Sequence, residues 1–276
     1  MNALDPLRRE LDHWGDAGET ATLWGRDDDA DAPTVPIRRM LALSDATAAP
    51  VFIAVVPDKA VDALAEPLLA CAGAIPLQHG FAHADHSPAD VKGKWELGLH
   101  RPLDEILGEL RAGSIRMTDL FGDRICPMLA PPWNRIAPEL FPHLPDLGFD
   151  VVSVFAPREK ADVAPRLSMI NGHGDLIAWK RGRTFIGVEK TANRLVEHLA
   201  ARRAGCVCRA TGGEYDADGL VDGVLQVEQM LTTGGGWQDQ AGGILGGVRR
   251  CASAAARPLK VASASRQIGG AQLALL

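Results

Sequence analysis

Along most of the chain, short apolar runs alternate with segments whose apolar residues recur at helical spacing. The run at 50–57, bounded by prolines, is typical of a fully buried parallel strand. The segment at 189–204 is the clearest helix, with two arginines in its last turn. The pattern also predicts strands at 21–26, 74–78, 125–130, 150–155 and 167–171. It predicts helices at 4–14, 37–43, 60–72, 103–111 and 138–147.

Strands that alternate with helices at this spacing predict βαβ units and a parallel sheet. Polar residues follow several separate strands: aspartates after 21–26, histidines after 74–78, and Pro-Pro-Trp-Asn after 125–130. A barrel collects such residues at the carboxyl ends of its strands. An open doubly wound sheet would instead bind its ligand at one switch point with a glycine-rich loop, and no such loop follows the first strand. The pattern therefore favours an α/β barrel.

The character of the chain changes after about residue 205, where glycine-rich stretches and an Ala/Ser/Arg-rich end replace the alternation. One helix is expected at 221–231, and the rest lacks sustained periodicity. We predict two units, a barrel over 1–205 and an atypical Gly/Ala-rich tail over 206–276. The tail is expected to be poorly ordered, or to be the product of a shifted reading frame. Translating the gene in its other two frames tests the second idea.

Composition excludes several classes of protein. The 276 residues are 46% hydrophobic, enough for a sizeable core, and the net charge of −6 argues against a nucleic-acid or anionic-membrane surface. No apolar run is long enough to span a membrane, and the charged amino-terminal stretch does not look like a secretory signal, so a cytoplasmic location is expected. The five cysteines are irregularly spaced, which predicts free thiols rather than a disulfide framework.

Candidate metal ligands follow the first and third predicted strands. Three aspartates, Asp27, Asp28 and Asp29, follow the first, and His79 and His83 follow the third. One carboxylate and two neutral imidazoles suit zinc or a similar divalent ion, with cobalt, nickel and manganese as alternatives. The ion activates a water and polarises a carbonyl, while a second carboxylate takes the water's proton. These residues predict a metal hydrolase. The aspartate run does not decide which Asp is the metal ligand and which is the base.

The order of three motifs carries a resemblance. Asp-Asp, then His-x-x-x-His, then Pro131-Pro132-Trp133 resembles the NodB-homology polysaccharide deacetylases, carbohydrate esterase family four and its relatives. The resemblance covers about residues 20–205. It implies a distorted (β/α)7-type barrel, a divalent metal held by one Asp and two His, and removal of an acetyl group from a carbohydrate. Its first motif implies a base Asp followed by a metal-binding Asp.

The first two motifs assign roles residue by residue. The run from Arg26 through the aspartates is similar to the Arg-x-Asp-Asp form of divergent members. One register makes Asp28 the base and Asp29 the ligand, and the other makes them Asp27 and Asp28. The family's second motif, His-(Ser/Thr)-x-x-His, is matched by the two candidate histidines, with glycine where Ser or Thr is usual. The third nearby histidine, His86, is expected at the periphery.

The third motif, Arg-Pro-Pro-(Tyr/Phe) in the family, is matched without its arginine, which orients the base. Arg26 and Arg135 are the candidates to replace it. The resemblance implies that Pro132 and Trp133 form the wall against the acyl group, and Asn134 offers a hydrogen bond to substrate. Trp95, Glu96 and the neighbouring lysines have the composition of a solvated face.

Two further features concern the end of the barrel. Asn-Gly-His-Gly-Asp at 171–175 resembles an Asn-x-His-x-Asp segment of small divergent members, so His173 and Asp175 are candidate substrate-binding residues. The family's closing Leu-x-His, whose histidine is the general acid, has no counterpart. His198, within a predicted helix, is the last histidine of the chain.

Together these features predict a metal-dependent enzyme that removes an acyl group from an N- or O-acylated carbohydrate or a related amide. Its partner is expected to be a small-molecule or carbohydrate substrate, with neither nucleic acid nor membrane. The alternative is a non-catalytic protein of the same fold that binds metal or carbohydrate. A phosphate-binding barrel enzyme is the weakest candidate, because no glycine-rich anion loop follows a late strand.

Overall fold

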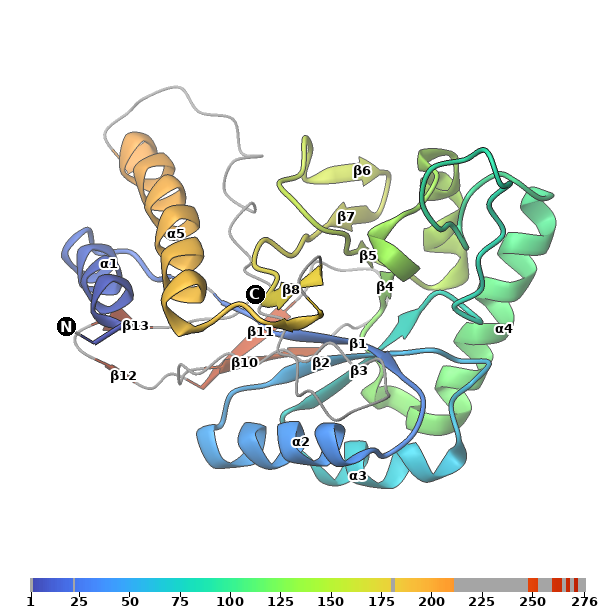
Figure 1. Ribbon diagram of the computed structural model, residues 1–276, viewed down its shortest axis with the longest axis horizontal. Coiled ribbons are helices and arrows are strands. Elements are labelled where there is room, and N and C mark those ends of the chain that lie inside the picture. Colours follow the sequence, from blue (N-terminus) through green and yellow to red (C-terminus); the bar gives the residue numbers. More distant parts are fainter. Residues whose placement is uncertain are drawn as a thin grey trace.

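A computed structural model describes residues 2–21, 23–179, 182–210, 248–252, 260–264, 267–268 and 271–272. Its centre is a seven-stranded sheet in the order β1-β2-β3-β4-β5-β7-β6 (Figure 1). The strands are Arg26–Ala30 (β1), Val51–Val55 (β2), Ala74–His79 (β3), Met128–Ala130 (β4), Val151–Val152 (β5), Asp162–Ala164 (β6) and Leu167–Met169 (β7). Neighbouring strands are parallel except β6 and β7, which are antiparallel.

The first five strands lie in the sheet in the order in which they occur in the chain. Such a sheet winds in one direction and has no switch point, which is the arrangement of a β/α barrel rather than of a doubly wound sheet. The structure confirms the predicted α/β class with this barrel-type order.

The sheet is strongly curled, because the side chain of Arg26 on β1 reaches the end of β5. Arg26 on β1 donates hydrogen bonds from Nη1 to the carbonyl and the hydroxyl of Ser153, at 3.1 and 2.8 Å. Ser153 directly follows β5, four strands away in the sheet. In a flat sheet those strands would be about 19 Å apart, because neighbours are spaced by about 4.8 Å. An arginine side chain cannot reach so far, so the sheet closes toward itself around the concave face.

Helices cover the convex face and one end of the sheet. The α-helices are Asp5–Asp16 (α1), Val35–Thr47 (α2), Ala65–Ala70 (α3), Leu103–Phe121 (α4) and Val188–Ala210 (α5). The 3-10 helices are Asp62–Leu64 (η1), Gly122–Arg124 (η2), Pro132–Asn134 (η3) and Pro138–Leu147 (η4). Figure 1 shows α2 beside α3, and α1 beside α5 at the other end of the sheet from α4.

Smaller sheets account for the remaining strands. These are Ile177–Ala178 (β8), Thr184–Phe185 (β9), Val248–Ala252 (β10), Lys260–Ala264 (β11), Gln267–Ile268 (β12) and Ala271–Gln272 (β13). β8 pairs with β9, β10 with β11, and β12 with β13, all antiparallel.

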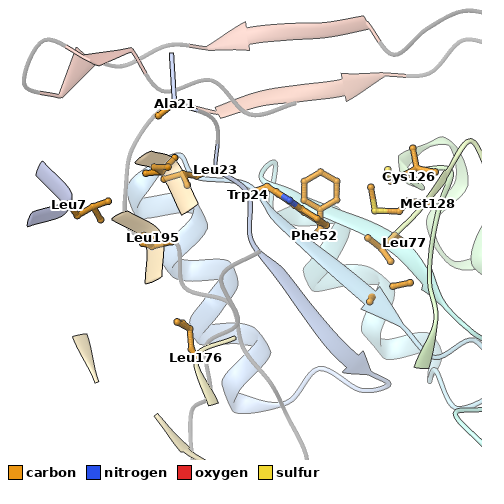
Figure 2. Packing of buried hydrophobic residues seen from close by; sticks show 14 of the residues in the cluster. Leu7, Ala21, Leu23, Trp24, Phe52, Leu77, Cys126, Met128, Leu176 and Leu195 are labelled. Atoms are coloured by element: carbon orange, nitrogen blue, oxygen red, sulfur yellow. The ribbon is translucent and has the colours of Figure 1, made fainter. Parts of the chain in front are cut away.

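The core follows from the period-two alternation of the strands. On β2, Phe52 and Ala54 point to the concave side, while Val51, Ile53 and Val55 pack under the outer helices. The concave-side cluster also takes in one face each of α1 and α5, through Leu7, Leu195 and their neighbours (Figure 2). Within it the ring of Trp24 packs edge-on against Phe52, with centroids 5.1 Å apart. A third cluster fills the space between α4, η4 and strands β4, β5 and β7.

Most predicted elements are confirmed, and several boundaries were wrong. The first strand was predicted at 21–26, but β1 is Arg26–Ala30, so the aspartates lie within the strand rather than after it. The helix predicted at 103–111 extends to Phe121. Strands β6, β8 and β9 were not predicted, and neither were the strands β10 to β13 in the expected tail. The helix expected at 221–231 lies outside the described residues. Among the described helices, none is long and apolar enough to cross a membrane.

Candidate functional site

The adjacent carboxylates of β1 are separated by a β-bulge. Asp28 follows the strand alternation and lies on the same face as Arg26. The pairing of β1 with β2 then shifts register between Asp27 and Ala30, and Asp29 has a φ of +68°. A bulge re-aims a side chain that regular pleating would turn to the opposite face. Here it brings Asp29 to the histidines that follow β3.

His79 is the last residue of β3 and is 2% exposed. Its ring nitrogen Nδ1 lies 2.8 Å from the carbonyl oxygen of Ala130, at the end of the neighbouring strand β4. Because a carbonyl oxygen only accepts, Nδ1 carries the proton, and Nε2 is the nitrogen that faces the site. Nε2 lies 3.0 Å from Oδ1 of Asp29.

His83 lies in the loop after β3 and reaches the same oxygen. Its Nε2 is 3.0 Å from Oδ1 of Asp29, and its backbone is left-handed, with a φ of +51°. Its ring packs against Trp133, with centroids 4.3 Å apart, and is tilted toward the ring of His79 at 5.2 Å.

Asp29, His79 and His83 therefore form a cluster in which one ligand-type atom of each lies within 4.8 Å of the others. Burial alone would raise the pKa of Asp29, but hydrogen bonds to the two histidines outweigh it and hold that pKa well below its usual value. Burial would lower the pKa of His79, whereas its hydrogen bond to Asp29 and the charges of Asp28 and Asp29 raise it. The carboxylate of Asp29 therefore favours positive charge beside it.

Asp28 is held by a buried arginine. Nε of Arg26 lies 2.6 Å from Oδ1 of Asp28, and Nη2 donates to Oδ2 at 2.7 Å. Arg26 is fully buried and Asp28 is 6% exposed. The bidentate geometry fixes the plane of the carboxylate. Of the two arginines proposed to replace the missing one, Arg26 is the one that contacts Asp28, whereas Arg135 donates to the carbonyl of Lys94 and lies over the ring of Trp95.

The Pro-Pro-Trp-Asn segment contacts both the Asp29–His79–His83 cluster and the Arg26–Asp28 pair. Trp133 and Asn134 both have a φ of +55°, a costly conformation for residues other than glycine that persists only where the surroundings enforce it. This turn directs Trp133 to His83 and Asn134 to Arg26, whose Nη2 donates to Oδ1 of Asn134 at 2.8 Å. Pro132 is buried beneath the turn. Asn134, expected to meet substrate, thus uses its oxygen to hold the guanidinium.

His173 and Asp175 are placed after β7 and are held by other partners. The ring of His173 stacks on that of His198 from α5, with centroids 4.1 Å apart. Asp175 accepts hydrogen bonds from the backbone N–H of Ile177 and from Nε1 of Trp179. Burial raises the pKa of Asp175, and the charge of Asp28 adds to this, so the two carboxylates are within electrostatic range.

Three residues discussed in the sequence analysis lie outside the Asp29–His79–His83 cluster. Asp27 is fully buried opposite Ile53, on the face of β1 away from Asp28. His86 is exposed and contributes its backbone N–H to the carbonyl of Trp95, in keeping with a peripheral position. The prediction for Glu96 was wrong, because this carboxylate is fully buried rather than part of a solvated face.

Fold and site together define an α/β protein with barrel-type strand order, whose strand ends bring an Asp-His-His cluster next to a buried Arg–Asp pair. No family model matches the chain. A stretch of 51 residues is 45% identical to the L-fucokinase/L-fucose-1-P guanylyltransferase of Bacteroides fragilis. That stretch is 18% of this chain and spans 5% of that enzyme.

Solved structures similar to this chain include several deacetylases and esterases. A Mycobacterium smegmatis protein assigned as a polysaccharide deacetylase is 17% identical, over 76% of this chain and 77% of that one, with a TM-score of 0.48. A CE4 esterase of Streptococcus mutans is 10% identical, over 80% and 89%, with a TM-score of 0.41. Peptidoglycan deacetylase PdaC of Bacillus subtilis is 13% identical, over 70% and 98%, with a TM-score of 0.40. At these levels, function has to be inferred from the site itself.

Proposed function

We propose that this protein is a metal-dependent hydrolase that removes an acetyl or similar acyl group from an N- or O-acylated carbohydrate or a related amide. The observation that supports it best is the convergence of Asp29, His79 and His83 beside Asp28, whose carboxylate is held by Arg26. This pairs a metal-ligand set with a second, separately oriented carboxylate. The motif order of the NodB-type deacetylases in the sequence agrees with it.

The donor set fits a divalent ion such as zinc, with cobalt, nickel and manganese as alternatives. Two imidazoles and one carboxylate are a common three-ligand set in catalytic zinc sites, which leaves positions for water and substrate. His79 is oriented as a ligand, since its Nδ1–H is donated to Ala130 and its Nε2 is directed at the cluster. Asp29 and His83 are 23% and 20% exposed, so substrate can reach this side of the cluster.

In this proposal the ion supplies Lewis acidity, which activates a water and polarises the acyl carbonyl. Asp28 is the general base that takes the proton from the attacking water. Arg26 keeps the carboxylate of Asp28 in one orientation and balances its charge. This assignment follows the register in which Asp29 is the ligand, with Asp27 on the opposite face of the strand.

The aromatic ring beside the cluster gives the acyl group an apolar wall. Trp133 packs against His83 at a tilt and, with Pro132 beneath it, shields one side of the site from water. A short acyl group such as acetyl suits this wall. His173 and Asp175, which follow a later strand, are proposed to contact the remainder of the substrate. The cytoplasmic location stays a prediction, and it favours a small sugar derivative over a polymer.

A non-catalytic protein of this fold is the less favoured alternative. Two features of the sequence favoured this alternative, and the first was the missing arginine of the third motif. Arg26 makes the contacts to the base that this arginine is expected to make. The other support, the absent terminal histidine, remains a feature of the sequence.

The decisive experiment is metal analysis followed by an activity assay on the same preparations. Purified protein loaded with zinc or cobalt is expected to hold one ion per chain, and His79→Ala is expected to lose it. His86→Ala, which removes a peripheral histidine of the same stretch, is the matched control and should keep the ion. Asp28→Asn should retain the ion and lose at least about a hundredfold in acetate release from N-acetylglucosamine oligomers. Unmutated protein that binds neither ion would exclude the proposed function.

A further inference from the structure

Glu96 is a buried carboxylate that the proposed chemistry does not use. It is fully buried, in the long connection between β3 and α4. The residue after Glu96 anchors the chain at this point, because Leu97 is buried and forms a β-bridge with Ile136. A carboxylate is rarely buried in this way unless hydrogen bonds replace its hydration.

Within the described part of the chain, the hydrogen bonds of Glu96 come from the loop that carries His83. Oε1 accepts from the backbone N–H of Ala82 at 2.7 Å and of Ala84 at 3.4 Å. Oε2 accepts from the N–H of Phe81 at 3.2 Å. The two neighbours of His83 in the chain, Ala82 and Ala84, are thus both bonded to one carboxylate oxygen.

The same carboxylate explains the glycine in the His-x-x-x-His motif. Gly80 has a φ of +54°, and a Cβ there would lie 1.9 Å from Oε2 of Glu96 and 2.6 Å from the ring of Pro132. Glu96 therefore fills the space that a side chain at position 80 would occupy. The Ser or Thr that is usual in the related motif cannot be placed here without displacing the carboxylate.

The two histidines are held by different means. His79 belongs to β3 and is oriented by the carbonyl of Ala130, so the sheet itself positions it. His83 lies in an irregular loop with a left-handed backbone, a conformation that surrounding contacts must enforce. The ring of Trp133 packs against that of His83, and the backbone N–H groups on both sides of His83 are bonded to Glu96. Earlier in the loop, the carbonyls of Gly80 and Phe81 accept hydrogen bonds from Gln78 and Asp58.

We propose that Glu96 is a positioning residue of the metal site, which binds the amides around His83 and thereby directs its imidazole to Asp29. The inference rests on the proposed function, because it presupposes that the cluster binds a metal. According to this inference, Glu96 orients His83 and has no part in orienting His79. Loss of the carboxylate should therefore act through His83 and leave His79 in place.

The test is a double-mutant cycle measured as zinc affinity on the full chain, by competition with a chromophoric chelator. Glu96→Gln is expected to weaken zinc binding by about 10- to 100-fold, the usual effect of losing a partner that orients a ligand. His83→Ala should weaken it at least as much. The double variant is expected to bind no more weakly than His83→Ala alone. Glu139→Gln, the same change at an exposed position of η4, is the control and should bind as the unmutated protein does.

Each outcome has a separate meaning. If the unmutated protein binds no zinc, the proposed function fails and the inference fails with it. If it binds zinc and Glu96→Gln binds equally tightly with only a lower melting temperature, Glu96 has a structural role and the inference is overturned. Additive losses in the double variant would overturn it as well. If Glu96→Gln does not fold, Glu96→Asp, which keeps the charge but shortens the side chain by one methylene, takes its place and should show the same loss.

Discussion

At the residue scale, the site depends on a buried charge pair that a single substitution can break. Arg26 and Asp28 are 0% and 6% exposed, and the guanidinium makes further hydrogen bonds to Ser153 and Asn134. A buried ion pair need not stabilise a protein relative to apolar residues, but removal of one partner leaves the other charge without compensation. The pair is thus not in itself evidence of a stabilised fold, but its disruption should be costly.

Arg26→Ala is expected to lower the free energy of unfolding by about 3–5 kcal/mol, because the Asp28 carboxylate is left buried without its counter-charge. Zinc binding should persist in the variant, since the ligand atoms come from other residues, while acetate release is lost. Urea denaturation and zinc titration measure the two effects.

Arg166→Ala is the matched control for this prediction. Arg166 pairs with Asp146, and their side chains are 69% and 76% exposed, so the change should cost no more than about 1 kcal/mol. Equal losses in the two variants would contradict the role given to the buried pair.

The sequence predicted the composition of the site better than its geometry. The His-x-x-x-His motif and the aspartate run pointed to the clustered residues, because imidazoles and carboxylates are metal-ligand types that can be recognised without knowing the fold. Which aspartate meets the histidines depends on one bulged residue with a positive φ, and a single bulge leaves no periodic signal. Glu96 was missed for a related reason. Lys92 and Lys94 shortly before it suggest a solvated face, and only the return of the chain over the His83 loop buries it.

At the element scale, period and proline boundaries predicted the strands that are buried on both faces, such as β2 and β3. The same reasoning missed β6, β8 and β9, which have three or two residues. Strands β4, β5 and β7 are as short, but they lie within longer apolar runs that the pattern did predict as strands. Every strand of the central sheet except β6 could thus be predicted from hydrophobic pattern. The edge strand β6 could not, because it is defined by its pairing with β7 rather than by an apolar pattern of its own.

Helix α5 is expected to be a structural part of the sheet's core. Leu199 is fully buried in the concave-side cluster, and its carbonyl accepts a hydrogen bond from Nε1 of Trp14 at 3.2 Å. Leu199→Ala should lower the free energy of unfolding by about 2–5 kcal/mol, as large-to-small changes in a packed core do. Val188→Ala at the exposed start of the same helix should change it by less than about 0.5 kcal/mol. Urea denaturation of both variants decides whether α5 unfolds with the sheet; a small loss for Leu199→Ala would show that it does not.

At the scale of the whole molecule, the predicted division near residue 205 can be sharpened. Every residue of the three hydrophobic clusters, among those the structure describes, lies at or before Leu199. The seven-stranded sheet and the candidate site also lie before this point. Helix α5 continues to Ala210, beyond the predicted boundary, and Arg203 within it pairs with Glu10 of α1 at 2.8 Å. A division that keeps α5 whole therefore falls after Ala210.

A shortened chain that ends at Ala210 is expected to fold and to bind one zinc ion as tightly as the full chain. About 200 residues with a shared core bury enough apolar surface for an independent domain. The measurements are a single cooperative urea transition that coincides by circular dichroism and by tryptophan fluorescence, and zinc stoichiometry. A second shortened chain ending at Gly187, which removes α5, is the contrasting case and should lose the cooperative transition, because the concave-side cluster then lacks Leu195 and Leu199. If the chain ending at Ala210 is itself unfolded, residues beyond it complete the core, and the division into a barrel and a dispensable tail is wrong.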